Sequence, residues 1–125
     1  MAFSQYFATQ VLSWVKGSSF PAALSNVYIT LHSADPGTAG TNGDVTSSIT
    51  NSANRTQIAS TALSSVGSAS GGGFEVTNSS VVQLTTSANN SSSITVSHFG
   101  VWDAQTGGNF LASGTLTSSV DVETG

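Results

Sequence analysis

Few side chains in this sequence of 125 residues could carry out chemistry. A serine nucleophile needs a neighbouring base, and the histidines available for that role are His32 and His98. Neither lies in a nucleophile elbow such as Gly-x-Ser-x-Gly. We interpret His98 as a structural histidine and His32 as a solvated residue at the end of a strand. The sequence therefore gives no support to nucleophilic catalysis.

Six carboxylates are the other candidates: Asp35, Asp44, Glu75, Asp103, Asp121 and Glu123. A pair of them could hydrolyse a glycosidic bond, but their spacing favours no pair. Asp35 and Asp103 adjoin turns, where an aspartate accepts hydrogen bonds from backbone amides. Asp35, Asn42 and Asp44 could offer oxygens to calcium, although their spacing does not follow an EF-hand loop. We expect no enzyme, no cofactor and no metal site.

Charge and cysteine content bear on the partners. Only Lys16 and Arg55 are cationic and the net charge is −4, so we expect no nucleic-acid partner, because phosphates require several basic residues. The chain has no cysteine, so it has no disulfide and no thiolate metal site. No apolar run reaches the length of about 18 residues that suggests a membrane span. The N-terminus lacks the basic leader of a signal peptide, so we expect folding in a cytoplasm.

The composition suits a protein that packs against other proteins. Charged residues make up 6% of the chain, against about a quarter in ordinary soluble proteins. Serine, threonine, asparagine and glycine supply the polar surface, and these short side chains lose little entropy when ordered. At this length we expect one domain, in which residues 1–20 form a docking segment and residues 21–125 form a β-sandwich.

The docking segment is the predicted helical part. Residues 3–16 carry Phe3, Phe7, Val11 and Trp14 at helical spacing, and Gly17 follows as a helix stop. These rings must be buried, either against the chain's own sheet or against a neighbouring subunit. The candidate docking residues are Phe3, Tyr6, Phe7, Trp14 and Phe20.

From residue 26 onward the period changes to that of a strand. Residues 27, 29 and 31 are apolar on one face, and Tyr28, Thr30 and His32 are on the other. The turn at Asp35-Pro36-Gly37 ends this strand, and residues 37–54 form a polar loop. Further strands are predicted at 55–63, 74–77, 81–84, 94–103, 109–117 and through 120–122, with links at 64–73 and 85–93. Residues 104–108 form a hairpin connection. We predict a mainly β fold, an antiparallel β-sandwich with one N-terminal α-helix.

Two segments resemble a known family. Residues 26–37 resemble the N-x-Y-x-x-L-x-[ST]-x-D-P opening of small tailed-bacteriophage virion proteins, which are often labelled tail-fibre proteins and are similar to capsid decoration proteins. Residues 98–111 resemble the family's H-[FW]-G-[IVL]-x-D-A-x-T-G-G-N-x-L block. Each position has a structural reason: Gly100 leaves room for an aromatic ring, for which Trp102 is the candidate, while His98, Phe99 and Trp102 form core framework. The motif residues are Asp35, Pro36, His98, Phe99, Gly100, Trp102, Asp103, Gly107, Gly108 and Asn109.

The resemblance implies a structural protein of a phage particle, assembled in the bacterial cytoplasm. Our first hypothesis is a capsid decoration (cement) protein that packs against the major capsid protein as a homo-oligomer, with a trimer favoured. The alternative is a tail-fibre or tail-tip component that binds host glycans through loop 37–54, although the chain has no repeats or coiled-coil heptads. A third reading is a carbohydrate-binding module in which Tyr28 or Trp102 stacks on sugars. Family members continue with one more strand, so we expect an open sheet edge near residue 125 that pairs with another subunit.

Overall fold

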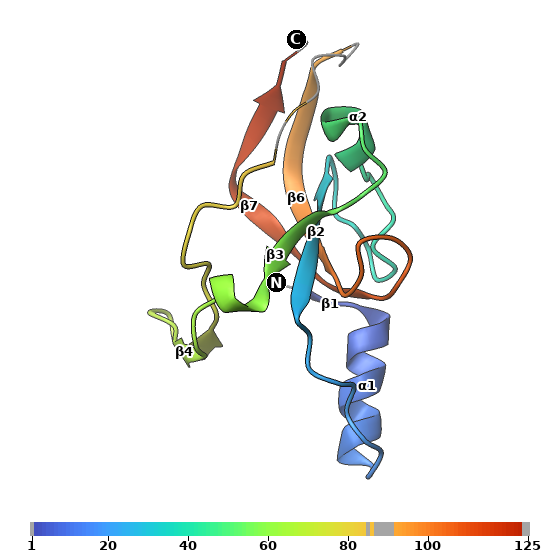
Figure 1. Cartoon of the computed structure of the whole chain (residues 1–125), viewed down its shortest axis with the longest axis vertical. Coiled ribbons are helices and arrows are strands. Elements are labelled where there is room, and N and C mark those ends of the chain that lie inside the picture. The colour runs from blue at the N-terminus through green and yellow to red at the C-terminus, as the bar shows by residue number, and fades with distance from the viewer. Residues whose placement is uncertain (1, 85, 87–91, 124–125) are drawn as a thin grey trace.

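The computed structural model describes residues 2–84, 86 and 92–123 (Figure 1). Its main helix is α1 (Gln5–Val15), followed later by the short α2 (Thr46–Thr50) and a 3-10 turn, Ser60–Ala62. The strands are β1 (Ala2–Phe3), β2 (Asn26–His32), β3 (Thr56–Ala59), β4 (Gly67–Ser68), β5 (Phe74–Glu75), β6 (Ile94–Trp102) and β7 (Phe110–Val122).

The strands form two antiparallel sheets. The larger sheet has five strands in the order β1-β7-β6-β2-β3, and β4 pairs with β5 in a small second sheet. The predicted mainly β, sandwich-like fold with an N-terminal helix is thus confirmed. Figure 1 shows α1 projecting from one end of the large sheet, while β6 and β7 extend together towards the other end. Most of α1 therefore extends beyond the end of the large sheet.

The strand predictions differ in accuracy. The strand at residues 26–32 is confirmed, and β6 ends one residue before the predicted boundary. The segments 109–117 and 120–122 form one strand, β7, whose register against β6 shifts between Val96 and His98. Residues 81–84 form no strand, and β3 covers only part of 55–63. The predicted link 85–93 lies largely outside the described residues.

The predicted open edge falls on β7. On the side away from β6, β7 pairs with β1 only at Ala112 and Ser113. Between Ser113 and residue 123, the described chain supplies no second strand partner to β7. The pairing of this edge with another subunit stays a prediction.

The core of the large sheet uses the face of β2 that we expected to be solvated. His32 is 0% exposed and Thr30 is 1% exposed, whereas Ile29 and Leu31 on the other face are only half-buried. The prediction of a solvated His32 is therefore wrong. The buried apolar side chains of the described residues are Ile49, Val96, Trp102, Phe110 and Ala112.

A directed chain of hydrogen bonds explains how these polar groups are buried. His32 Nδ1 lies 2.8 Å from the carbonyl oxygen of Asn42, which can only accept, so Nδ1 carries the proton. His32 Nε2 consequently accepts from Thr30 Oγ1 at 2.7 Å, and this hydroxyl oxygen accepts from Trp102 Nε1 at 3.1 Å. Every polar side-chain atom of Thr30, His32 and Trp102 therefore has a hydrogen-bond partner, which removes the cost of burying it.

Candidate functional site

The position of α1 is fixed at its first residue. Ser4 is buried, its backbone amide donates to the carbonyl of Leu111 in β7, and its hydroxyl accepts from the amide of Phe7 at 2.9 Å. This N-cap starts the helix at Gln5. The prediction that Phe3 belongs to the helix is wrong, because Phe3 lies in β1 and pairs with Ala112 of β7.

The predicted docking aromatics pack against one another. Ring centroids are 4.7 Å apart for Phe3 and Phe7, 6.1 Å for Phe7 and Phe20, and 6.0 Å for Trp14 and Phe20. We call these four residues the aromatic cluster. Phe3 remains 63% exposed and Trp14 58% exposed, and no residue of α1 is buried. Burial of the whole segment against the chain's own sheet, the first of our two alternatives, is therefore wrong.

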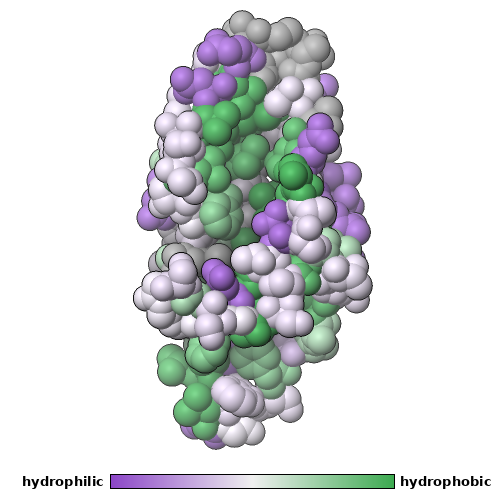
Figure 2. Space-filling model, turned by 90° about the vertical axis from the view of Figure 1, so that its left-hand side faces the viewer, coloured by the Kyte–Doolittle hydropathy of each residue, from purple (hydrophilic) through white to green (hydrophobic). Residues whose placement is uncertain are grey.

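The exposed apolar surface around α1 includes aliphatic residues besides the aromatic residues that the sequence analysis identified. Leu12 is 69% exposed, Val15 is 74% exposed, and Leu24 in the segment that runs back along the helix is also exposed. Figure 2 shows apolar side chains gathered at the end of the molecule where α1 lies. A signal for this surface is present in the sequence: Ala8, Leu12 and Val15 follow the same helical spacing as Phe7, Val11 and Trp14, one residue later.

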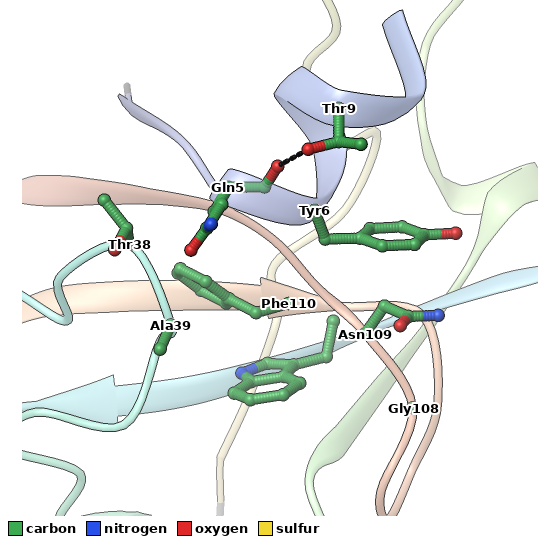
Figure 3. Close-up of a pocket in the computed structure, with 9 residues that line it drawn as sticks. Gln5, Tyr6, Thr9, Thr38, Ala39, Gly108, Asn109 and Phe110 are labelled. Atoms are coloured by element: carbon green, nitrogen blue, oxygen red, sulfur yellow. Dashed lines mark hydrogen bonds between the residues drawn. The ribbon is translucent and has the colours of Figure 1, made fainter. Parts of the chain in front are cut away.

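The polar side of α1 lines an open hollow of about 420 Å³ (Figure 3). Its floor is formed by Trp102 and Phe110, whose ring centroids are 5.1 Å apart. The surrounding side chains and backbone come from the first turns of α1, from the loop after β2 and from the β6–β7 connection. They are Gln5, Tyr6, Thr9, Thr38, Ala39, Gly108 and Asn109. The lining contributed by the described residues contains no carboxylate, lysine, arginine or histidine. Its amide and hydroxyl groups suit binding of an uncharged ligand.

Trp102 is held between two groups and is 8% exposed. The Arg55 guanidinium lies 3.8 Å from the centre of its ring, and Phe110 packs beside it. The prediction that Trp102 stacks on a sugar is therefore wrong for this ring. Tyr28, the other ring that we considered, is half-buried directly opposite Trp102 in the register of β2 and β6.

Arg55 is a structural residue that the sequence did not reveal. Its Nη1 donates to the carbonyls of Ala104 and Gly107, at 2.7 Å each, and so joins the start of β3 to the β6–β7 connection. Burial lowers the pKa of Arg55, and the charges of Asp44 and Asp103 partly oppose this shift. The guanidinium of Arg55 thus holds the β6–β7 connection in place while it stacks on the ring of Trp102.

The remaining motif residues frame this connection. Asp103 Oδ1 accepts from the backbone amide of Asn109 at 2.6 Å, and Oδ2 accepts from its side-chain amide at 2.9 Å. Gly107 and Gly108 have positive φ values of 60° and 68°, a conformation that glycine adopts without strain. At the other turn, Asp35 Oδ1 accepts from the amide of Gly37 at 2.9 Å, and Pro36 is buried.

The first residues of the second motif block lie on β6. His98 is half-buried with Nδ1 2.8 Å from Ser97 Oγ, and half-buried Phe99 lies over Gly114. A Cβ at Gly100 would meet Thr30 Oγ1 at 2.5 Å and the Phe110 ring at 3.1 Å. The aromatic ring for which Gly100 leaves room is therefore Phe110, and the prediction of Trp102 is wrong.

The loop at 37–54 contains α2 and is fixed by its own hydrogen bonds. Asn42 Nδ2 donates to the carbonyl of Asp35, and Asp44 Oδ1 accepts from the amide of Thr46. Within residues 2–84, 86 and 92–123, no three His, Cys, Asp or Glu side chains are grouped as metal ligands. The helices of the described chain are all too short or too polar to cross a membrane.

Comparison with known proteins gives one result for nearly the whole chain. Residues 2–125 match the family model described as "Gp80: Podophage GP4 fiber I protein gp80". The match includes α1, the polar loop and the β6–β7 hairpin. A search of curated proteins finds no match.

Proposed function

From the finding that this chain belongs to the family of the podophage GP4 fiber I protein gp80, we propose that it is a fibre subunit attached to the virion through its N-terminal apolar surface. The family membership makes the protein a structural component of a phage virion. The observation that carries the attachment proposal is the exposure of the aromatic cluster on a helix without a buried residue.

The total surface supports an assembly role. The chain exposes 7714 Å². A folded monomer of 12.6 kDa is expected to expose about 6,200 Å². The excess of about 1,500 Å² compares with about 800 Å² that each partner hides in a standard protein interface. This additional surface is large enough for contacts with neighbouring subunits.

The position of the charges favours the same end of the molecule. All six carboxylates occur at or after Asp35, and residues 1–34 carry only Lys16. Asp103 lies beside Phe7 and Phe20, and both of its carboxylate oxygens already accept hydrogen bonds from Asn109. Because α1 itself carries no acid, a docking surface there requires little desolvation of charge. Covering an exposed aromatic ring contributes about 1–2 kcal/mol to such a contact.

Single alanine substitutions in the aromatic cluster test the attachment. Phe3→Ala and Trp14→Ala are each expected to weaken virion binding about 5- to 30-fold, because each removes about 1–2 kcal/mol of apolar contact. The measurement is the amount of protein that sediments with virions assembled without it. Phe74→Ala is the matched control, since Phe74 is also exposed but lies on β5. Unchanged occupancy for both α1-end variants would exclude this surface as the attachment site.

Capsid decoration against the major capsid protein is the second candidate. The sequence has no repeats, and long fibres usually have them, which favours a small decoration protein. The same apolar surface would serve both roles, so the two differ in location. Electron microscopy of intact particles discriminates them: density along a fibre supports our proposal, and density across capsomer boundaries replaces it with decoration.

Host-glycan binding, the activity in the fibre alternative, has a candidate position in the hollow of Figure 3. The hollow presents Gln5, Thr38 and Asn109, and uncharged amides and hydroxyls suit a neutral saccharide. We expect neutral disaccharides on a glycan array to bind the wild type and to lose at least tenfold in affinity with Asn109→Ala. An array without binders would remove this role and leave virion attachment intact.

A further inference from the structure

Helix α1 carries two apolar stripes with the same spacing. Phe7, Val11 and Trp14 stand at i, i+4 and i+7, and Phe3 and Phe20 contact this stripe within the chain but leave Trp14 largely exposed. Ala8, Leu12 and Val15 repeat the spacing one residue later and are all exposed. We call this second set the open stripe. Together the stripes give α1 an apolar arc of roughly half its circumference, wider than a helix on a sheet surface needs.

We infer that the open stripe is covered by the same stripe of a second copy of this chain, so that α1 helices pack side by side in a homo-oligomer. The inference deepens the proposed function and rests on it for the role of α1 as an assembly surface. The residues of the open stripe differ from those of the aromatic cluster, so the aromatic cluster remains available to contact the virion.

The spacing of the open stripe fits another helix. Alternating steps of four and three residues place side chains along one seam, and two identical seams interlock as knobs into holes. Ala8 is small, so it permits close approach of the two backbones near the start of the helix, while Leu12 and Val15 fill the contact further along. The stripe spans only about two turns, which is too short to appear as a heptad repeat in the sequence.

Electrostatics is compatible with a second copy at this place. Each copy has a net charge of −4, so two copies repel one another wherever their acidic surfaces meet. Residues 1–34 contain no acid, and the cation of this segment, Lys16, lies at the C-terminal end of α1, where a positive charge is favourable. Asp103 lies beside Phe7 and Phe20, in a pocket on the aromatic side of α1. Contact through the open stripe therefore brings together helix surfaces that carry no acid themselves.

The available area is sufficient for both contacts. The excess surface of about 1,500 Å² is nearly twice the amount of about 800 Å² that a standard interface hides on each partner. One such contact would leave a large part of the excess exposed. The excess belongs to the whole surface, to which Phe74 and Val81 also contribute, and it is large enough for a helix contact between copies and a separate contact with the virion.

The test is the mass of the full chain in solution at micromolar concentration, measured by light scattering after gel filtration. The wild type is expected at two or three times 12.6 kDa, and Leu12→Gln with Val15→Gln is expected at 12.6 kDa. Glutamine is a good helix former, so the change removes the apolar stripe and preserves the helix, which circular dichroism checks. The matched control is Val66→Gln with Val81→Gln, two exposed valines outside α1, which should keep the wild-type mass.

The outcomes separate this inference from the proposed function. A monomeric wild type, or a double variant of α1 that keeps the oligomer, would overturn the inference. Trp14→Ala should remain oligomeric while it loses virion occupancy. If Trp14→Ala were as monomeric as the Leu12 and Val15 double variant, the two stripes would form one contact and the inference in its present form would be wrong.

Discussion

Replacing Trp102 by alanine is expected to lower the free energy of unfolding by about 3–5 kcal/mol. Trp102 is a large buried side chain at the C-terminal end of β6, it packs on Phe110, and its indole donates to Thr30. Its removal leaves a cavity under the Arg55 guanidinium and breaks the first hydrogen bond of the chain that ends at Asn42. Domains are stable by only about 5–15 kcal/mol, so this loss is a large fraction of the free energy of unfolding.

Urea unfolding followed by circular dichroism measures this loss, and the chain contains its own control. Trp14→Ala deletes the same side chain from a position that is largely exposed, so we expect a loss below about 1 kcal/mol. Trp102→Phe retains an aromatic ring and loses the hydrogen bond to Thr30, for which we expect about 1–3 kcal/mol. Equal losses for the two alanine variants would contradict the assignment of Trp102 to the core.

Gly40→Ala is expected to destabilise the fold by about 2–4 kcal/mol, from left-handed strain of about 1 kcal/mol and overpacking of about 1–3 kcal/mol. Gly40 has a φ of 77°, and a Cβ at this buried position would overlap the ring of Phe110, including Cδ2 at 2.7 Å. The ring forms the floor of the hollow and cannot move without disturbing Trp102. Thermal unfolding of the purified variant is the measurement.

Gly37→Ala isolates the two causes, because it shares the backbone conformation without the close contact. Its φ is 75°, and a Cβ there meets nothing within 4 Å. We expect only the conformational loss of about 1 kcal/mol. If the two alanine variants melted at the same temperature, contact with Phe110 would not explain the glycine at position 40.

The success of the sequence-based strand predictions depended on local signals. The strand at residues 26–32 has strict alternation and ends at a proline turn, and β6 is followed by a glycine-containing connection, so both were predicted closely. The alternation does not show which face of β2 is buried, and the polar residues on one face do not make that face exposed. Thr30 and His32 are buried because partners from other elements satisfy them, and the sequence alone does not show that pairing.

The candidate site was predicted in part for the same reason. Aromatic residues near the N-terminus stand out in the sequence, but Leu12 and Val15 are ordinary helix residues whose exposure follows from how α1 leaves the sheet. Arg55 was missed because its acceptors, Ala104 and Gly107, lie 49 and 52 residues further along the chain. Local spacing gives no indication of contacts at such separations.

The pairing of β1 with β7 sets the order in which the molecule becomes complete during synthesis. Ala2 and its partner Ser113 are 111 residues apart in the sequence, so this pair forms only after the whole intervening chain has been made. The amide of Ser4, which anchors the start of α1, also waits for Leu111. A nascent chain consequently carries α1 without its attachment to the sheet, and the geometry needed for assembly arises only once β7 has been made. Interrupted translation products would therefore be poor competitors for places in the particle.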